Sequence, residues 1–367
     1  SHRMICTQLD NDAIVFGAEE YLHEALAPYV EQPPALLAII SSCAAGLIGD
    51  DIEAIARGAG LSCPIAVLDS SGLAGSFADG WDKAACAVLS AFTPEQRSGQ
   101  ANAVNLIGMT SAYYNGENDA HELMRLLALA GYRVNAVLGC AMSAADLSGL
   151  TQASLNIVVH DELGSGAARL LAETCGTPYI APLPPYGRAG TREWLAEIGR
   201  VLPAPCADAA QEEITRVTRE DFLRINECKS IWGELRYDTA VIRAPRSAAW
   251  GLAQALRTEW ADICHLAVAA ETKGAQETMG IADEILSEMD AMRMQELLSC
   301  MEDGLLLGSS NESAHIHPQR TQYLAVSYPV QDVLQLTDNP FMGLRGARYI
   351  EETLWNGSIL RRKILLS

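Results

Sequence analysis

The sequence predicts an α/β protein of three Rossmann-like domains, with mostly parallel sheets around a central cleft. Short apolar runs of strand length alternate with segments of helical period along most of the chain. The alternation continues over 367 residues, a length that suggests two to three domains with ample core. Polar segments containing Pro or Gly interrupt it at 93–100 and 203–208. The predicted domains are therefore residues 1–97, 98–205 and 206–367.

The first predicted domain is organised around residues 36–60. Leu36–Ile40 is a short apolar run bounded by prolines and serines, which is typical of a buried strand. Apolar residues then recur at helical spacing from Leu47 to Ala56, and glycines at 58 and 60 end this predicted helix. Cys43 is therefore expected between the carboxyl end of a strand and a helix. Open α/β sheets bind ligands at that edge.

The rest of this domain is predicted to contain a strand, a loop and a helix. Cys63–Asp69 has strand character and Trp81–Phe92 has helical period. The loop between them, Ser70–Gly80, is rich in Gly and Ser. Loops of this kind can hold a cluster or a substrate through their backbone, although most glycine loops are only turns.

The second predicted domain alternates strands with helices. The expected strands are Ala103–Met109, Val134–Gly139, Leu155–His160 and Pro178–Ala181, and the expected helices are Asp119–Ala130, Asp146–Ala153 and Gly166–Cys175. This spacing indicates a parallel sheet covered on both faces. His160 then lies at a strand end, where it could be a general acid or a metal ligand near neutral pH. A structural histidine with a satisfied hydrogen bond is an equally good interpretation.

The third predicted domain starts with a helix from Asp208 to about Arg236. The elements expected after it are a strand at Thr239–Arg243, a helix at Ser247–Trp260, a strand at Ile263–Ala269, a largely helical stretch to Met301, strands at Leu305–Gly308 and Leu324–Tyr328, and a final helix within 339–356. Arg243, Arg246 and Ser247 could bind an anion at a strand end, but a solvated surface pair of arginines is the better interpretation.

Composition excludes several classes of function. The net charge of −20 argues against nucleic acid as a partner, because phosphates require basic patches. No apolar run approaches the ~18–20 residues that span a bilayer, and no signal-peptide pattern opens the chain, so a cytoplasmic protein without membrane contact is expected. The ten cysteines are scattered without a CxxC pair, which indicates reduced thiols. No GxxxxGK(S/T) motif is present, so no nucleotide is expected on this chain.

Three segments carry a resemblance to a known family. SSCAAGLIGDDIEAI at 41–55, residues 153–198, and NPFMGLRGARYIEETLWN at 339–356 resemble corresponding parts of nitrogenase component 1-type proteins. That family includes the nitrogenase molybdenum–iron protein subunits, cofactor-assembly scaffolds, and the protochlorophyllide and nickel-tetrapyrrole reductases. A Cys followed six residues later by Gly-Asp-Asp is a fairly specific pattern in this context.

The resemblance implies that Cys43 ligates an iron–sulfur cluster, of the 4Fe-4S type, at a subunit interface. Iron in such clusters usually takes four thiolates. Family members usually carry further cluster cysteines upstream of the region where this sequence begins, so Cys43 is the one ligand that the resemblance assigns here. The other ligands are expected from such upstream residues, from a second subunit, or from a non-Cys ligand such as a carboxylate.

The resemblance also implies a substrate or cofactor site in the cleft. Ser70, Gly72 and Gly75 fall in the family's G-x-x-G-S loop. His160 falls where the catalytic nitrogenase subunit has a cofactor cysteine, and Met342 falls near that subunit's cofactor histidine. Because neither residue type is kept, the iron–molybdenum cofactor is not expected here in its usual form.

The leading hypothesis is a nitrogenase-like redox subunit that takes electrons from an ATP-dependent iron–sulfur reductase and reduces a bound substrate. Its partners would be that reductase and a second subunit, in a homodimer or in a paralogous heterodimer or heterotetramer. One alternative is a non-catalytic scaffold for metallocluster assembly. Another is a metal-free small-molecule binding protein. The sequence does not choose between a tetrapyrrole, a small sulfur compound or another substrate.

Overall fold

The strands form three parallel sheets. The computed structural model describes residues 4–69, 75–92, 99–140, 142–270, 280–287 and 290–366. Within them, a sheet of two strands has the order β1-β2, one of four has β4-β3-β5-β6, and one of five has β11-β10-β7-β8-β9. All the strand pairs recorded in these sheets are parallel. The predicted α/β class with parallel sheets is confirmed, whereas the domain boundaries stay a prediction.

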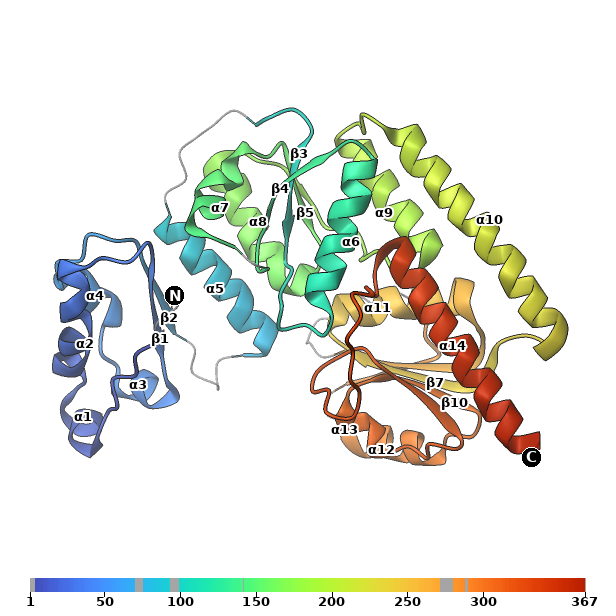
Figure 1. The fold of residues 1–367 in the computed structure, drawn as a ribbon. Coiled ribbons are helices and arrows are strands. Elements are labelled where there is room, and N and C mark those ends of the chain that lie inside the picture. The colour runs from blue at the N-terminus through green and yellow to red at the C-terminus, as the bar shows by residue number, and fades with distance from the viewer. Residues whose placement is uncertain are drawn as a thin grey trace.

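The two-stranded sheet belongs to the N-terminal segment, which Figure 1 shows at one side of the molecule. It consists of β1 (Leu37–Ser41) and β2 (Ile65–Asp69), with α1 (Asn11–Phe16), α2 (Glu19–Glu31), α3 (Cys43–Ile48) and α4 (Ile52–Gly58). The prediction of one helix after β1 is wrong. Gly49 ends α3 in the left-handed region at φ +81°, and the Asp51 carboxylate starts α4 by accepting a hydrogen bond from Ala54 N at 3.0 Å.

The four-stranded sheet is buried on both faces, as predicted. Its strands are β3 (Ala103–Ile107), β4 (Arg133–Val137), β5 (Leu155–Val158) and β6 (Tyr179–Ile180). Leu106 and Ile157 join one apolar cluster, whereas Ile107 and Val158 join another. The neighbouring helices are α5 (Phe77–Ala91), α6 (Gly116–Leu129), α7 (Ala144–Gly149), the short 3-10 helix η1 (Leu150–Gln152), α8 (Asp161–Cys175) and α9 (Gly187–Val201). Helix α5 contacts both β2 and α8, and so links the N-terminal segment to this sheet.

The five-stranded sheet holds most of the C-terminal half. Its elements are α10 (Ala207–Trp232), β7 (Arg236–Ala244), α11 (Arg246–Ala255), the π-helical turn η2 (Leu256–Trp260), β8 (Asp262–Ala270), β9 (Glu284–Leu286), α12 (Ala291–Cys300), β10 (Gly304–Gly308), α13 (Ser310–Ser313), β11 (Thr321–Ala325) and α14 (Gly343–Leu366). The stretch predicted to be largely helical up to Met301 instead contains β9, which pairs with β8. Helix α10 is continuous, and α14 runs further than expected.

Helices α9, α10 and α14 connect the elements around the four-stranded sheet to those around the five-stranded sheet. Helix α9 packs against α10, α11 and α14, and α14 also contacts α6. Leu126 of α6, Ile214 of α10 and Leu344 of α14 meet in a small apolar cluster. Figure 1 shows α10 and α14 along the flank beside both sheets. No helix among the described residues is both long and apolar enough to cross a membrane.

Candidate functional site

A cavity of about 190 Å³ lies where the carboxyl ends of strands from the two larger sheets meet. Its walls come from the segments that follow β3, β5, β6, β7 and β11, and from the start of α5. This is the edge at which parallel sheets place their ligands. The lining residues are Phe77, Ala112, Tyr113, Tyr114, Gly116, Asp119, His160, Tyr186, Pro245, Ala248, Val326, Ser327 and Tyr328.

A glycine brings two of these segments together. Gly108 directly follows β3 with φ at +78°, and a Cβ at this position would lie 2.4 Å from the carbonyl oxygen of His160. The same Cβ would meet Gly164 of α8 at 3.2 Å. Only glycine tolerates both the backbone conformation and the close approach. The loop after β3 can therefore pass directly beside His160.

His160 is buried and lines the cavity from the N-terminal end of α8. Its Nδ1 lies 2.6 Å from the Oγ of Ser247, on α11. The Tyr113 ring meets the imidazole edge to face, with centroids 5.0 Å apart. Burial penalises the charged imidazolium and lowers the pKa of His160 to about 4, although nearby Asp161 opposes this shift. In the folded chain the His160 side chain is therefore neutral at pH 7. The prediction of a buried histidine at a strand end agrees with this position, and its catalytic role stays a prediction.

Ser247 connects His160 to Glu162, a half-buried acid that sequence reasoning missed. The Ser247 hydroxyl donates to Glu162 Oε1 at 3.0 Å, and its main-chain N–H lies 3.3 Å from both carboxylate oxygens. Tyr113 Oη donates to the same Oε1 at 3.3 Å. Burial raises the pKa of Glu162, and a hydrogen bond with Asp161 adds to that rise. In the sequence Glu162 lies before the predicted helix Gly166–Cys175, and no role was expected for it; in the structure it belongs to the first turn of α8.

Asp119 is the second acid that sequence reasoning missed. It lies in the first turn of α6, is 3% exposed and lines the cavity. Its Oδ1 accepts hydrogen bonds from the main-chain nitrogens of Phe341 at 2.6 Å and Met342 at 2.8 Å. Burial nevertheless raises the pKa of Asp119 to about 7, because desolvation of the carboxylate outweighs these two bonds. An acid with this pKa can hold or release a proton near neutral pH.

Aromatic side chains form much of the remaining wall. Phe77 stands 6.1 Å from Tyr113, and Tyr114 meets Tyr328 edge to face at 5.5 Å between ring centroids. The cavity thus combines flat apolar surfaces with a few polar groups, which is the usual composition of a small-molecule site.

The other residues predicted for this cleft are Ser70, Gly72, Gly75 and Met342, and neither Gly75 nor Met342 is among the residues that line the cavity. Ser70 and Gly72 lie outside the described residues. Gly75 directly precedes Ser76, the N-cap of α5, so the predicted loop leads into the helix whose first residue lines the cavity. The Met342 side chain is buried in the main core and is not part of the lining. Its link to the cavity is its main-chain bond to Asp119.

The structure does not place Cys43 in this cavity. It is the first residue of α3, directly after β1, as the sequence predicts, and it is exposed. Phe16 is 85% exposed at the end of α1, a helix that contacts α3, and Ile40 is 66% exposed on β1. Among the described residues, no three His, Cys, Asp or Glu side chains are grouped so that they could hold a metal ion. The role of Cys43 as a cluster ligand therefore stays a prediction.

Arg243 and Arg246, considered above for anion binding, are both in ion pairs. Arg243 pairs with Glu312 at 3.2 Å and Arg246 with Asp161 at 2.7 Å. Both side chains are partly buried, 27% and 19% exposed, so they are ion-paired residues and not the solvated surface pair that the sequence suggested.

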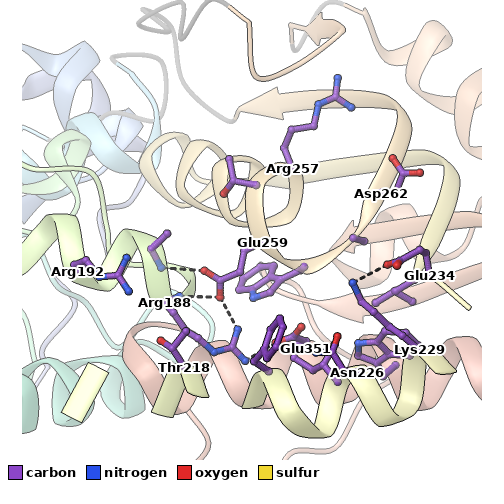
Figure 2. Close-up of a pocket in the computed structure, with 18 residues that line it drawn as sticks. Arg188, Arg192, Thr218, Asn226, Lys229, Glu234, Arg257, Glu259, Asp262 and Glu351 are labelled. Carbon is purple, nitrogen blue, oxygen red and sulfur yellow. Dashed lines mark hydrogen bonds and ion pairs between the residues drawn. The ribbon is translucent and has the colours of Figure 1, made fainter. Parts of the chain in front are cut away.

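A larger cavity, of about 450 Å³, lies at the opposite end of the five-stranded sheet. Its lining includes Leu235 and Asp262, at the amino ends of β7 and β8. Figure 2 shows two ion pairs among its charged groups, Arg188 with Glu259 and Lys229 with Glu234. The smaller cavity is the better candidate because it lies at the ligand-binding edge of the sheets, and its acid with a raised pKa, Asp119, is bonded to main-chain nitrogens. In the larger cavity the acid with a raised pKa, Glu351, is already paired with Arg188.

Comparisons with known proteins agree with these observations. A family model described as nitrogenase component 1 type oxidoreductase matches residues 1–357. A light-independent protochlorophyllide reductase subunit of Synechococcus sp. (strain JA-3-3Ab) is 24% identical over 379 residues, covering 96% of this chain and 73% of the relative. The corresponding protein from Nostoc punctiforme (strain ATCC 29133 / PCC 73102) is 27% identical over 272 residues, covering 70% of this chain and 52% of the relative.

A solved structure described as "Nitrogenase Cp1 at pH 6.5" shares the fold. Its TM-score is 0.78 at 14% identity, and the match covers 97% of this chain and 82% of that one. A second, described as "Nitrogenase Cp1 at pH 5", has a TM-score of 0.75 at 19% identity, and the match covers 98% of this chain and 78% of that one.

Proposed function

The chain belongs to the nitrogenase component 1-type oxidoreductase family, and we propose that it is a redox subunit that reduces a small substrate in the cavity beside His160. Electrons would arrive from a separate ATP-dependent iron–sulfur reductase. The single observation that carries this proposal is the cavity itself. It places His160 and Asp119 at the carboxyl edges of two parallel sheets, within an aromatic wall.

Reduction of an organic substrate consumes protons as well as electrons. Asp119, with its pKa raised to about 7 by burial, can supply a proton at neutral pH. The aromatic side chains of the wall offer flat surfaces against which a conjugated substrate would pack. At about 190 Å³, the cavity is smaller than the roughly 300–1,000 Å³ pockets that hold drug-sized ligands. This volume favours a small substrate, or one ring of a larger one, over a whole tetrapyrrole.

Cys43 is proposed as a ligand of an iron–sulfur cluster shared with a second subunit. Such a cluster would supply electrons to the substrate. Three observations support a shared position: the thiol is exposed, large apolar side chains such as Phe16 and Ile40 are exposed on neighbouring elements, and this chain offers no complete set of ligands among its described residues. The curated relatives are themselves named as subunits of a larger reductase.

The test is electron transfer from an ATP-dependent iron protein to the complex that contains this chain. We expect ATP-dependent oxidation of the reductase, followed by multiple turnovers with a substrate that fits the cavity. Cys43→Ala should abolish the electron transfer. Electron acceptance without any turnover would favour an assembly scaffold over an enzyme. No ATP-dependent oxidation of the reductase by the intact complex would refute the redox role.

A further inference from the structure

Three side chains form a continuous hydrogen-bonded path from the cavity to a half-buried acid. The path runs from His160 Nδ1 to Ser247 Oγ at 2.6 Å, and from Ser247 Oγ to Glu162 Oε1 at 3.0 Å. The path lies at the contact between α8 and α11: it begins and ends at the N-terminal end of α8, with His160 and Glu162, and passes through Ser247 of α11. We propose that His160, Ser247 and Glu162 form a proton relay that serves a substrate in the cavity.

Because Ser247 has a single hydroxyl proton, the protonation state of Glu162 decides which ring nitrogen of His160 carries a proton. A hydroxyl has one proton to donate. When Glu162 is a carboxylate, that proton is donated to Oε1, so Nδ1 of His160 must carry the proton of the second bond and Nε2 is unprotonated. When Glu162 is protonated, it can donate to Ser247, which then donates to Nδ1. In that state Nε2 carries the imidazole proton.

The relay step follows from the second state. Nε2–H transfers its proton to the substrate as the substrate is reduced, Ser247 Oγ–H transfers its proton to Nδ1, and Glu162 transfers its proton to Ser247. Three bonds to hydrogen break and three form. The net change is one proton moved from Glu162 to the substrate, while the electrons come from the ATP-dependent iron–sulfur reductase. His160 is the residue that would touch the substrate, and Ser247 and Glu162 act through it.

The surroundings of Glu162 suit a proton reservoir. The groups that face it are Ser247, the Tyr113 hydroxyl, the buried Tyr186 and Asp161, and Asp161 is paired in turn with Arg246. Burial raises the pKa of Glu162, which brings its protonation closer to neutral pH. Asp161 is 38% exposed, and it therefore offers a route by which protons from water can reach Glu162.

The relay can be tested without substrate or reductase, by NMR of the intact chain labelled with ¹⁵N-histidine. His160→Gln assigns the His160 signals. We expect the proton to sit on Nδ1 at alkaline pH and to shift toward Nε2 as Glu162 becomes protonated. Glu162→Gln should abolish this pH-dependent change, and Ser247→Ala should uncouple His160 from Glu162. Ser247→Thr should restore the coupling because it keeps the hydroxyl.

Ser327→Ala is the matched control. It removes another buried hydroxyl from the cavity wall, one that donates to the Arg243 carbonyl and not to the relay. The His160 signals should keep their pH dependence in this variant. The same His160 pH profile in wild type, Glu162→Gln and Ser247→Ala would overturn the relay. Because the inference rests on the proposed function only for its electrons, an intact NMR response in a chain that accepts no electrons would refute that function and leave the relay standing.

Discussion

At the scale of single residues, the buried carboxyl of Asp119 makes stability depend on pH. Burial raises its pKa in the folded chain to about 7, from an ordinary value of 3.8. The folded state therefore holds a proton that the unfolded chain releases, and stability falls as pH rises from about 4 to about 7. Asp119→Asn keeps an oxygen for the N–H groups of Phe341 and Met342 but cannot ionise. Relative to wild type, this variant should gain on the order of a few kcal/mol between pH 4 and pH 8 in urea unfolding.

Asp146→Asn is the comparison variant, because the pKa of Asp146 is lowered on folding and its effect on stability therefore changes with pH in the opposite direction. Hydrogen bonds from Ser143 to its carboxylate lower the pKa of Asp146 at the start of α7. Its contribution is present above its ordinary pKa and is lost as pH falls through the lowered value. Asp146→Asn should therefore lose stability relative to wild type at neutral pH and not in strong acid. A stability difference for Asp119→Asn that is the same at pH 4 and pH 8 would contradict the role given to burial.

Three residues of the site show why it could be predicted only in part from the sequence. His160 could be placed at a strand end because the run before it is apolar and bounded. Asp119 could not be recognised, because an acid in the first turn of a helix usually serves the helix terminus, and Glu162 lay outside every predicted element. Their positions in the site arise from contacts with the segment just before α14 and with α11, more than 200 and more than 80 residues away. No local pattern encodes such contacts.

At the scale of elements, Gly108 sets how closely β3 approaches α8. We predict that Gly108→Ala loses several kcal/mol of unfolding free energy, the sum of left-handed strain of about 1–2 kcal/mol and an overpacking cost of about 1–3 kcal/mol. The reason is the 2.4 Å that would separate the new methyl group from the His160 carbonyl oxygen. Urea unfolding of the purified variant measures this loss.

Gly176→Ala separates the two contributions. Gly176 ends α8 with φ at +71°, yet nothing lies within 4 Å of the position that its Cβ would take. Its substitution should cost only the conformational strain, about 1 kcal/mol. Equal losses at the two glycines would mean that the contact between β3 and α8 contributes nothing.

Most strands could be predicted from sequence, because buried parallel strands are short apolar runs. Two of the differences from the structure have local causes. Gly49 adopts φ +81° within a pattern that is otherwise periodic, so one predicted helix is two. Strand β9 is only three residues long, and its pairing with β8 decides its conformation. A strand that short has too little periodicity to be distinguished from its surroundings.

At the scale of the whole molecule, Arg188 connects four elements through ion pairs. From α9 it pairs with Asp221 of α10, Glu259 of η2 and Glu351 of α14. Arg188→Met would leave Glu259 and Glu351 without their cation, while Asp221 keeps its ion pair with Arg348. Breaking such buried pairs typically costs about 3–5 kcal/mol. The loss should be smaller at acidic pH, because protonation removes the uncompensated charge. Urea unfolding at pH 5 and pH 8 measures both effects.

Arg216→Met is the matched control on the surface. Arg216 also pairs with two carboxylates, Glu213 and Glu220, but its side chain is 52% exposed. Water and salt screen these pairs, so their loss should change stability little at either pH. If Arg188→Met were no more damaging than Arg216→Met, the buried network would not hold the two larger sheets together.

The most direct test of the redox role is iron and acid-labile sulfide per chain, measured after anaerobic purification of the complex. We predict stoichiometric iron and sulfide in the wild type. Both should be lost in Cys43→Ala and kept in Cys206→Ala, which removes another exposed thiol at the start of α10. Iron that persists in Cys43→Ala, or a wild-type complex without iron after reconstitution, would contradict a cluster at Cys43 and leave a binding protein with a nitrogenase-like fold.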